Sequence, residues 1–139
     1  MINLCDAVPT DRPQMLVQTR PGDLRLKRLC LENNAEFVSY RDDLLSRVSR
    51  TDRFLALDRN VDRELEAIRT ICVNRQGRVI VLDGLDILLT YLRARSPTFS
   101  KSFVDRLVSM RQLDGILWVV LPATLVPADW PTYRLRRLD

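Results

Sequence analysis

The sequence RVIVLDGLD at residues 78–86 is the stretch that decides the fold class of this chain. Four consecutive apolar residues, Val79 to Leu82, run directly into Asp83, and a second acid, Asp86, follows three positions later. An apolar run without polar alternation is typical of a strand that is covered on both faces of a parallel sheet. The carboxyl ends of such strands carry the functional groups of α/β proteins. The stretch therefore predicts an α/β fold with Asp83 and Asp86 at the functional edge of the sheet.

Strand and helix patterns alternate on both sides of this stretch. Apolar runs bounded by turn residues predict strands at residues 13–19, 35–40, 79–83 and 116–121. Helical spacing predicts helices between these strands, and the clearest of them follows the Ser96-Pro97 start signal. This order indicates βαβ crossovers and parallel pairing. We expect one three-layer domain over residues 1–139 with a mostly parallel four-stranded sheet, and an irregular C-terminal tail at residues 123–139.

The composition is that of an ordinary globular protein, with 139 residues of which 46% are hydrophobic and 29% charged. The chain contains no apolar run long enough to span a membrane and does not begin like a signal peptide, so we expect a cytoplasmic protein. Cys5, Cys30 and Cys72 form no C-x-x-C pattern, which argues against a disulfide framework or a zinc site. The chain has no histidine, which excludes hydrolases that use a histidine base. We expect no metal and no cofactor.

A phosphate-binding loop is expected after the first strand of a nucleotide-binding domain, where this chain reads GDLRLKR at residues 22–28. Such a loop needs G-x-x-x-x-G-K-[ST] so that backbone N–H groups, lysine and hydroxyl surround the phosphates and magnesium. Here the spacing from Gly22 to Lys27 is one residue short, the second glycine is missing, and Arg28 replaces the hydroxyl residue. Gly22, Lys27, Asp83 and Asp86 thus form a degenerate nucleotide site at best, and we expect no enzymatic activity. Asp83 is expected instead to cap the following turn or to pair with an arginine.

Three segments resemble a degenerate RecA-like P-loop domain. They are residues 34–45, VIVLDGLDILL at residues 79–89, and residues 118–122. Within that group, the chain is similar to the small P-loop accessory (F) protein of BREX phage-defence systems. The resemblance implies a truncated P-loop NTPase-like domain that serves as an accessory subunit of a larger assembly in phage defence. Because a fold hosts many functions, the role must be argued from the site.

The first functional hypothesis is a scaffold that binds other protein subunits of such an assembly. A shortened parallel sheet exposes an edge, and exposed edges are usually covered by another element or by a partner. Trp130 and Tyr133 lie among arginines in the tail, and these residue types often anchor interfaces. The hypothesis makes Trp130 and Tyr133 partner-binding residues. The alternative is that they pack against the domain's own helices.

Two other hypotheses remain open from the sequence. Basic residues gather near the start of the first helix and at the end of the chain, which favours DNA binding through phosphate contacts, although such clusters are also typical of a solvated surface. These basic residues are Arg20, Arg25, Lys27, Arg28, Arg134, Arg136 and Arg137. The third hypothesis is a weak NTPase whose site is completed by a partner.

Overall fold

The computed structural model describes residues 2–20, 24–47, 61–75 and 78–138 of the chain. Its centre is a sheet of five parallel strands in the order β2-β3-β4-β1-β5. The strands are β1 (Gln14–Gln18), β2 (Glu36–Ser39), β3 (Val79–Asp83), β4 (Ile116–Pro122) and β5 (Leu135–Arg137). The α/β class and the parallel pairing predicted from residues 78–86 are confirmed.

The two most apolar runs of the sequence form the inner strands. β3 and β4 lie side by side, and Val81 pairs with Trp118 in their register. Every residue from Val79 to Leu82 is buried, and so is every residue from Leu117 to Leu121. Both faces of these strands are therefore covered, as expected for apolar runs without alternation.

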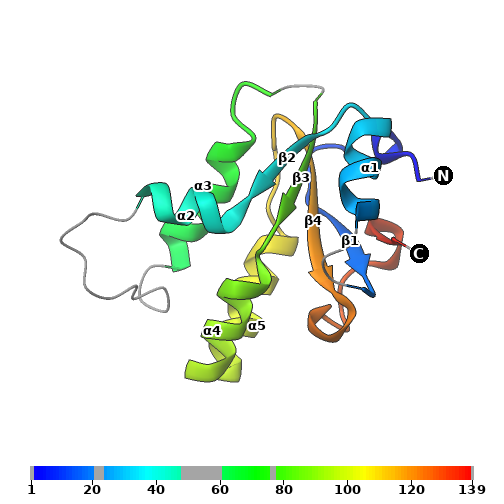
Figure 1. Cartoon of the computed structure of the whole chain (residues 1–139). Helices are drawn as coiled ribbons and strands as arrows, with labels where there is room; N and C mark the ends of the chain where they lie inside the picture. Colours follow the sequence, from blue (N-terminus) through cyan, green and yellow to red (C-terminus); the bar gives the residue numbers. More distant parts are fainter. Residues whose placement is uncertain (1, 21–23, 48–60, 76–77, 139) are drawn as a thin grey trace.

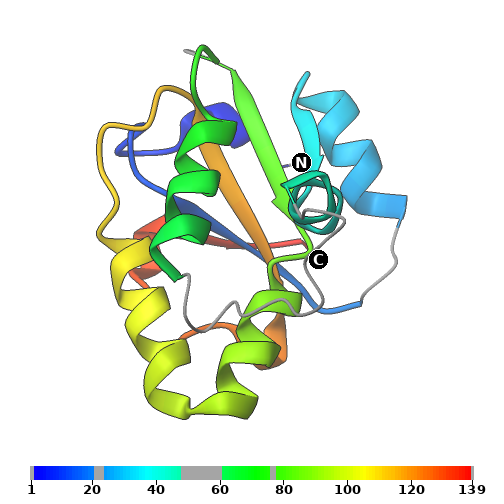
Figure 2. The same cartoon turned by 90° about the vertical axis from the view of Figure 1, so that its left-hand side faces the viewer.

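The helices cover the two faces of the sheet unequally (Figure 1). They are α1 (Leu24–Glu32), α2 (Tyr40–Arg47), α3 (Val61–Ile71), α4 (Asp86–Arg95) and α5 (Pro97–Val108). Buried residues of α1 pack with Leu16, Val81 and Trp118 on one face of the sheet. The buried residues of α2 to α5 pack on the opposite face with Met15, Leu82 and their neighbours, as Figure 2 shows from the side of these helices. The result is the three-layer arrangement expected from the strand and helix order.

The N-terminal segment adds to the α1 layer. It forms a single 3-10 turn, η1 (Leu4–Asp6), whose Leu4 is fully buried. The Nε1–H of Trp118 on β4 donates to the carbonyl oxygen of Leu4 at 2.9 Å. The side chain of Asn33, just after α1, accepts from the Leu4 N–H and donates to the Ile2 carbonyl oxygen. These bonds fix the end of α1 to the first residues of the chain.

The tail differs from its prediction in two ways. Residues 135–137 form β5, which pairs with β1 in parallel, so the sheet has five strands instead of the expected four. The tail also contains two 3-10 turns, η3 (Ala123–Leu125) and η4 (Thr132–Arg134). The prediction of an irregular tail was therefore wrong. The sequence Leu135-Arg136-Arg137 carries no apolar run, and its extended form depends on pairing with Met15 to Val17 of β1.

The helix start predicted at Ser96-Pro97 is confirmed. Ser96 caps α5 by accepting from the Thr98 N–H, and Pro97 is the first residue of the helix, as predicted. Residues 87–92 belong to α4, which lies between β3 and α5.

Candidate functional site at the carboxyl edge of the sheet

The chain leaves adjacent strands β1 and β4 toward opposite faces of the sheet. β1 leads to α1 on one face, whereas β4 leads to a segment whose Trp130 packs with the helices of the other face. Gln18 and Pro122, the last residues of the two strands, lie opposite each other in the register. In open parallel sheets, such a point of divergence opens a crevice at which ligands bind. This edge of the sheet is therefore the candidate functional site.

Asp83 lies at this edge, at the end of β3, as the sequence predicted. Its carboxylate is half-buried and accepts a hydrogen bond from the Gly84 N–H, so it caps the turn after the strand. Burial raises the pKa of Asp83, the Gly84 hydrogen bond opposes that rise, and the charge of Asp86 adds to it. Of the two alternatives expected for Asp83, the structure shows the turn cap, and no ion pair joins Asp83 or Asp86 to a cation within the described part of the chain.

Gly84 sets the direction of the chain after Asp83. Its φ is +93°, in the region that favours glycine. A Cβ at this position would also approach the Arg41 backbone nitrogen at 3.6 Å and the Tyr40 Cβ at 3.8 Å. The Asp-Gly pair in RVIVLDGLD thus brings the end of β3 against the junction of β2 and α2.

The lysine of the degenerate phosphate loop is not at the start of the helix. α1 begins at Leu24, so Lys27 is its fourth residue, and the side chain of Lys27 is exposed. The side of α1 that faces the sheet carries Leu26, Leu29 and Cys30. A phosphate-binding lysine belongs to the loop at the helix N-terminus, where the backbone N–H groups also point. Lys27 lies nearly a full turn beyond that position, and Gly22 lies outside the described residues.

The N-terminal basic cluster is solvent-exposed, as the DNA-binding hypothesis requires. Its four members all lie on the surface, between the end of β1 and the middle of α1. They are Arg20, Arg25, Lys27 and Arg28.

The C-terminal basic cluster does not form one surface. Arg134 is buried, and its guanidinium donates to the Pro13 carbonyl oxygen at 3.0 and 2.7 Å and to the Val108 carbonyl oxygen at 3.0 Å. Burial lowers the pKa of Arg134. Arg136 stacks over the Trp118 ring at 5.3 Å and donates to the Asn3 carbonyl oxygen. Of the three predicted phosphate-binding arginines, only Arg137 is exposed, so this part of the prediction was wrong for Arg134.

The two tail aromatics have different environments. Trp130 is 4% exposed, and its Nε1–H donates to the Arg134 carbonyl oxygen at 3.1 Å. The Arg134 guanidinium lies over the Trp130 ring at 5.4 Å. Trp130 is therefore part of the core, and its prediction as a partner-binding residue was wrong because the tail folds back on the helices. Tyr133 is 70% exposed and is accessible to a partner.

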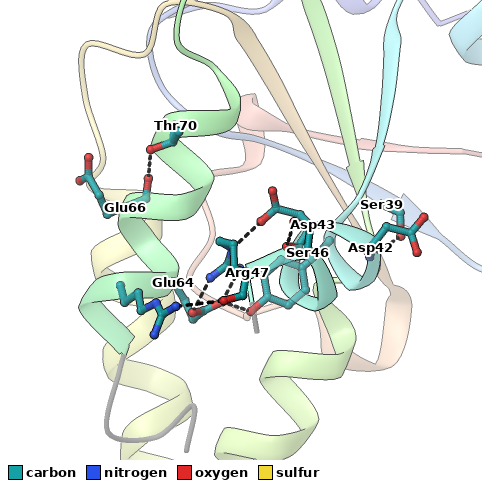
Figure 3. A network of polar contacts seen from close by, with 10 residues as sticks. Ser39, Asp42, Asp43, Ser46, Arg47, Glu64, Glu66 and Thr70 are labelled. Carbon is teal, nitrogen blue, oxygen red and sulfur yellow. Dashed lines mark hydrogen bonds and ion pairs between the residues drawn. The ribbon is translucent and has the colours of Figure 1, made fainter. Parts of the chain in front are cut away.

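A buried polar network joins α2 to α3 and was missed from the sequence (Figure 3). Glu64 is 2% exposed and accepts a hydrogen bond from the Tyr40 hydroxyl at 2.5 Å. Arg47 donates to both Glu64 carboxylate oxygens, at 3.0 and 2.8 Å, and its Nε donates to Asp43 at 2.9 Å. Glu64 lies on the apolar side of α3, together with Val61 and Leu65. An acidic residue on the apolar side of a helix was the sequence feature that could have indicated a buried polar network.

The network fixes the charge state of Glu64. Burial alone would raise the pKa of Glu64, but the hydrogen bonds from Arg47 and Tyr40 hold it below its ordinary value. The pKa of Tyr40 is raised by burial and by its hydrogen bond to Glu64. Glu64 is therefore an ionised carboxylate whose charge is satisfied inside the protein, which suits a structural role.

One groove of about 570 Å³ lies between α4, α5 and the segment after β4. Leu89, Val104 and Val126 give it an apolar floor, and both Lys101 and Asp105 lie on its walls. In the described part of the chain, no cluster of three or more metal-ligating side chains is present. No described helix has the length and apolar character needed to cross a membrane.

Neither protein-family models nor curated proteins give a match to this chain. The fold and the residues at the carboxyl edge of the sheet are the features of the molecule that bear on its function.

Proposed function

We propose that the chain is a non-catalytic accessory subunit of a cytoplasmic multi-protein assembly, built on a degenerate RecA-like P-loop domain. The observation that carries this proposal is the exposed position of Lys27 on α1, away from the start of the helix. A phosphate-binding loop works only when its lysine and backbone N–H groups converge on the same phosphates. Asp83 lies at the carboxyl edge of the sheet, at the end of β3. Lys27, the cation that a phosphate-binding loop would place opposite it, is exposed on α1.

The strand order supports the RecA-like part of the proposal. β1 lies between β4 and β5, and β4 separates β1 from the acid strand β3. RecA-like P-loop domains have this order, with the phosphate loop after the first strand and the acid at the end of the third. The likeness to the BREX accessory protein extends the proposal to an assembly in phage defence.

The native assembly provides the test. We expect the tagged chain, purified at its natural expression level, to elute with other protein subunits at a fixed stoichiometry. Asp83→Asn and Asp86→Asn should leave that stoichiometry unchanged, because neither carboxylate is needed for a nucleotide-dependent step. A chain that elutes alone, or an assembly that needs nucleotide and the Asp83 carboxylate to form, would contradict the proposal.

A second candidate function is a nucleotide site completed by a partner. It is favoured by Asp83 and Asp86, which lie close enough for their charges to interact and have no cation partner in the described part of the chain. Extraction of bound nucleotide from the purified assembly separates the two candidates. Stoichiometric nucleotide that is lost in Asp83→Asn would favour the completed site, and its absence favours the accessory role.

A further inference from the structure

Two large apolar side chains on α1 point away from the protein. Leu24 is 76% exposed and Leu31 is 83% exposed, the two highest values among the exposed large hydrophobic residues described. They are seven residues apart, which places them on the same side of a helix. Leu26, Leu29 and Cys30 hold the other side of α1 in the core. These two leucines therefore bury little apolar surface in the isolated domain.

The positions between the two leucines on this outward side are basic. Lys27 and Arg28 follow Leu24 by three and four residues, so the four residues form the i, i+3, i+4, i+7 pattern of one helix face. No ion pair to Lys27 or Arg28 is found among the described residues. We call Leu24, Lys27, Arg28 and Leu31 the outer face of α1. Its apolar ends and basic centre define the chemistry of what can cover it.

The outer face is held in a fixed position. After α1, the Ala35 N–H donates to the Cys30 carbonyl oxygen at 2.8 Å, and the Asn33 side chain donates to the Leu29 carbonyl oxygen at 2.9 Å. Asn33 also joins the helix end to the N-terminal segment. A surface that is rigid before binding loses less conformational entropy on association.

We propose that the outer face of α1 is the docking surface for an acidic amphipathic helix of a partner subunit. The proposal rests on the accessory function above and names the chemistry of the partner. Apolar residues at heptad spacing on the partner would cover Leu24 and Leu31, and acidic residues would pair with Lys27 and Arg28. A second copy of this chain would place Lys27 and Arg28 against like charges, so it is a poorer occupant. Nucleic acid would leave both leucines exposed.

The test uses the full chain and synthetic helical peptides of about three heptads. One peptide carries leucine at heptad spacing flanked by glutamate, and the second carries lysine in place of each glutamate. Binding is followed through the backbone amide NMR signals of the protein. We expect the acidic peptide to shift signals of α1 and the basic peptide to bind at least about tenfold more weakly.

Variants locate the binding on the outer face. The double variant Leu24→Ser, Leu31→Ser should bind the acidic peptide at least about tenfold more weakly than the unaltered chain. The double variant Lys27→Glu, Arg28→Glu should bind the basic peptide more tightly than the acidic one. Leu45→Ser on α2 is the matched control, because Leu45 is also exposed on a helix and lies outside the outer face. The control should bind like the unaltered chain.

Several results would overturn the proposal. One is acidic-peptide binding that is absent, or that is unaffected by the two serine substitutions. Another is duplex DNA bound through Lys27 and Arg28 with no effect of the leucines. A third is sedimentation that shows self-association lost in the serine variant, which would assign the outer face to a second copy. None of these results changes the expected outcome of the nucleotide-binding experiments. The proposed docking surface can therefore be wrong while the proposed non-catalytic function holds.

Discussion

Asp83 and Glu64 are both withdrawn from solvent, but their surroundings shift their pKa values in opposite directions. Asp83 has the Gly84 N–H and no cation partner among the described residues, and burial raises its pKa. Glu64 has Arg47 and Tyr40 as donors, and its pKa is lowered in spite of burial. A half-buried carboxylate with a raised pKa is a candidate for a functional role, whereas a carboxylate that is fully paired suits a structural role.

Substitutions at Asp83 should separate its charge from its hydrogen bond. A raised pKa means that the stabilisation from this group is present below its ordinary pKa and is lost as pH rises through the folded-state pKa. Asp83→Asn carries no charge and keeps an acceptor for the Gly84 N–H, so we expect it to be at least as stable as the unaltered chain at pH about 7. Asp83→Ala loses the acceptor and should cost about 1 kcal/mol. Urea denaturation at several pH values measures both, and an Asn variant less stable than the Ala variant near neutral pH would contradict this account.

Substitutions at Glu64 should show the opposite dependence on pH. Because its pKa is lowered, Glu64 contributes stability above its ordinary pKa, and this contribution is lost as pH falls through the folded-state value. Glu64→Gln leaves Arg47 without its main ion pair and should cost about 2 kcal/mol in free energy of unfolding near neutral pH. The matched control is Glu66→Gln on the same helix, since Glu66 is exposed and should change stability by less than about 0.5 kcal/mol. Equal stability of the two variants in urea denaturation would show that the network is not structural.

Single residues were partly predictable from the sequence. The position of Asp83 followed from the apolar run before it, because a buried parallel strand must end at the functional edge. Glu64 was not identified as a buried residue. It lies between two other acidic residues, Asp62 and Glu66, which are exposed, and the sequence does not distinguish the buried acid from the exposed ones. Arg47, its partner, lies in a helix with a weak apolar pattern, and no local signal joins the two positions.

At the scale of elements, the C-terminal tail behaves as part of the core. β5 pairs with β1, the Leu138 N–H donates to the Val17 carbonyl oxygen at 2.8 Å, and Trp130 packs with the helices. The inner strands could be predicted from their apolar runs, but β5 could not, because its sequence is basic and its conformation comes from tertiary pairing. The helix that carries Lys27 was predicted in the right place, yet only the structure showed which side faces outward.

The two tail aromatics should differ sharply in their contribution to stability. Trp130→Ala removes a large buried ring and the Nε1–H bond to Arg134, so we expect a loss of about 3 to 5 kcal/mol in free energy of unfolding. Tyr133→Ala removes an exposed ring and should cost less than about 0.5 kcal/mol. Thermal and urea denaturation of both variants measure the difference. A Trp130→Ala variant as stable as Tyr133→Ala would restore the tail as a separable binding segment.

At the scale of the whole molecule, the chain forms a five-stranded parallel sheet with helices on both faces, and residues 22–28 lack the sequence pattern of a phosphate-binding loop. The βαβ order predicted the parallel sheet and its layers, but the strand order and the fifth strand required the structure. The site was predicted only on its acidic side: Asp83 and Asp86 lie together at the carboxyl edge, whereas Lys27 is on the outer face of α1 and Arg134 is in the core. The spacing of these residues along the sequence could not show that they lie in three different parts of the structure.

Calorimetric titration of magnesium-ATP into the full chain tests the central claim most directly. Because Lys27 lies beyond the helix start and no hydroxyl residue follows it, we expect only heats of dilution up to millimolar nucleotide, with identical traces for Lys27→Ala and Asp83→Asn. Saturable binding in the micromolar range, lost in both of these variants, would show a working phosphate site and would contradict the assignment of this chain as a non-catalytic subunit.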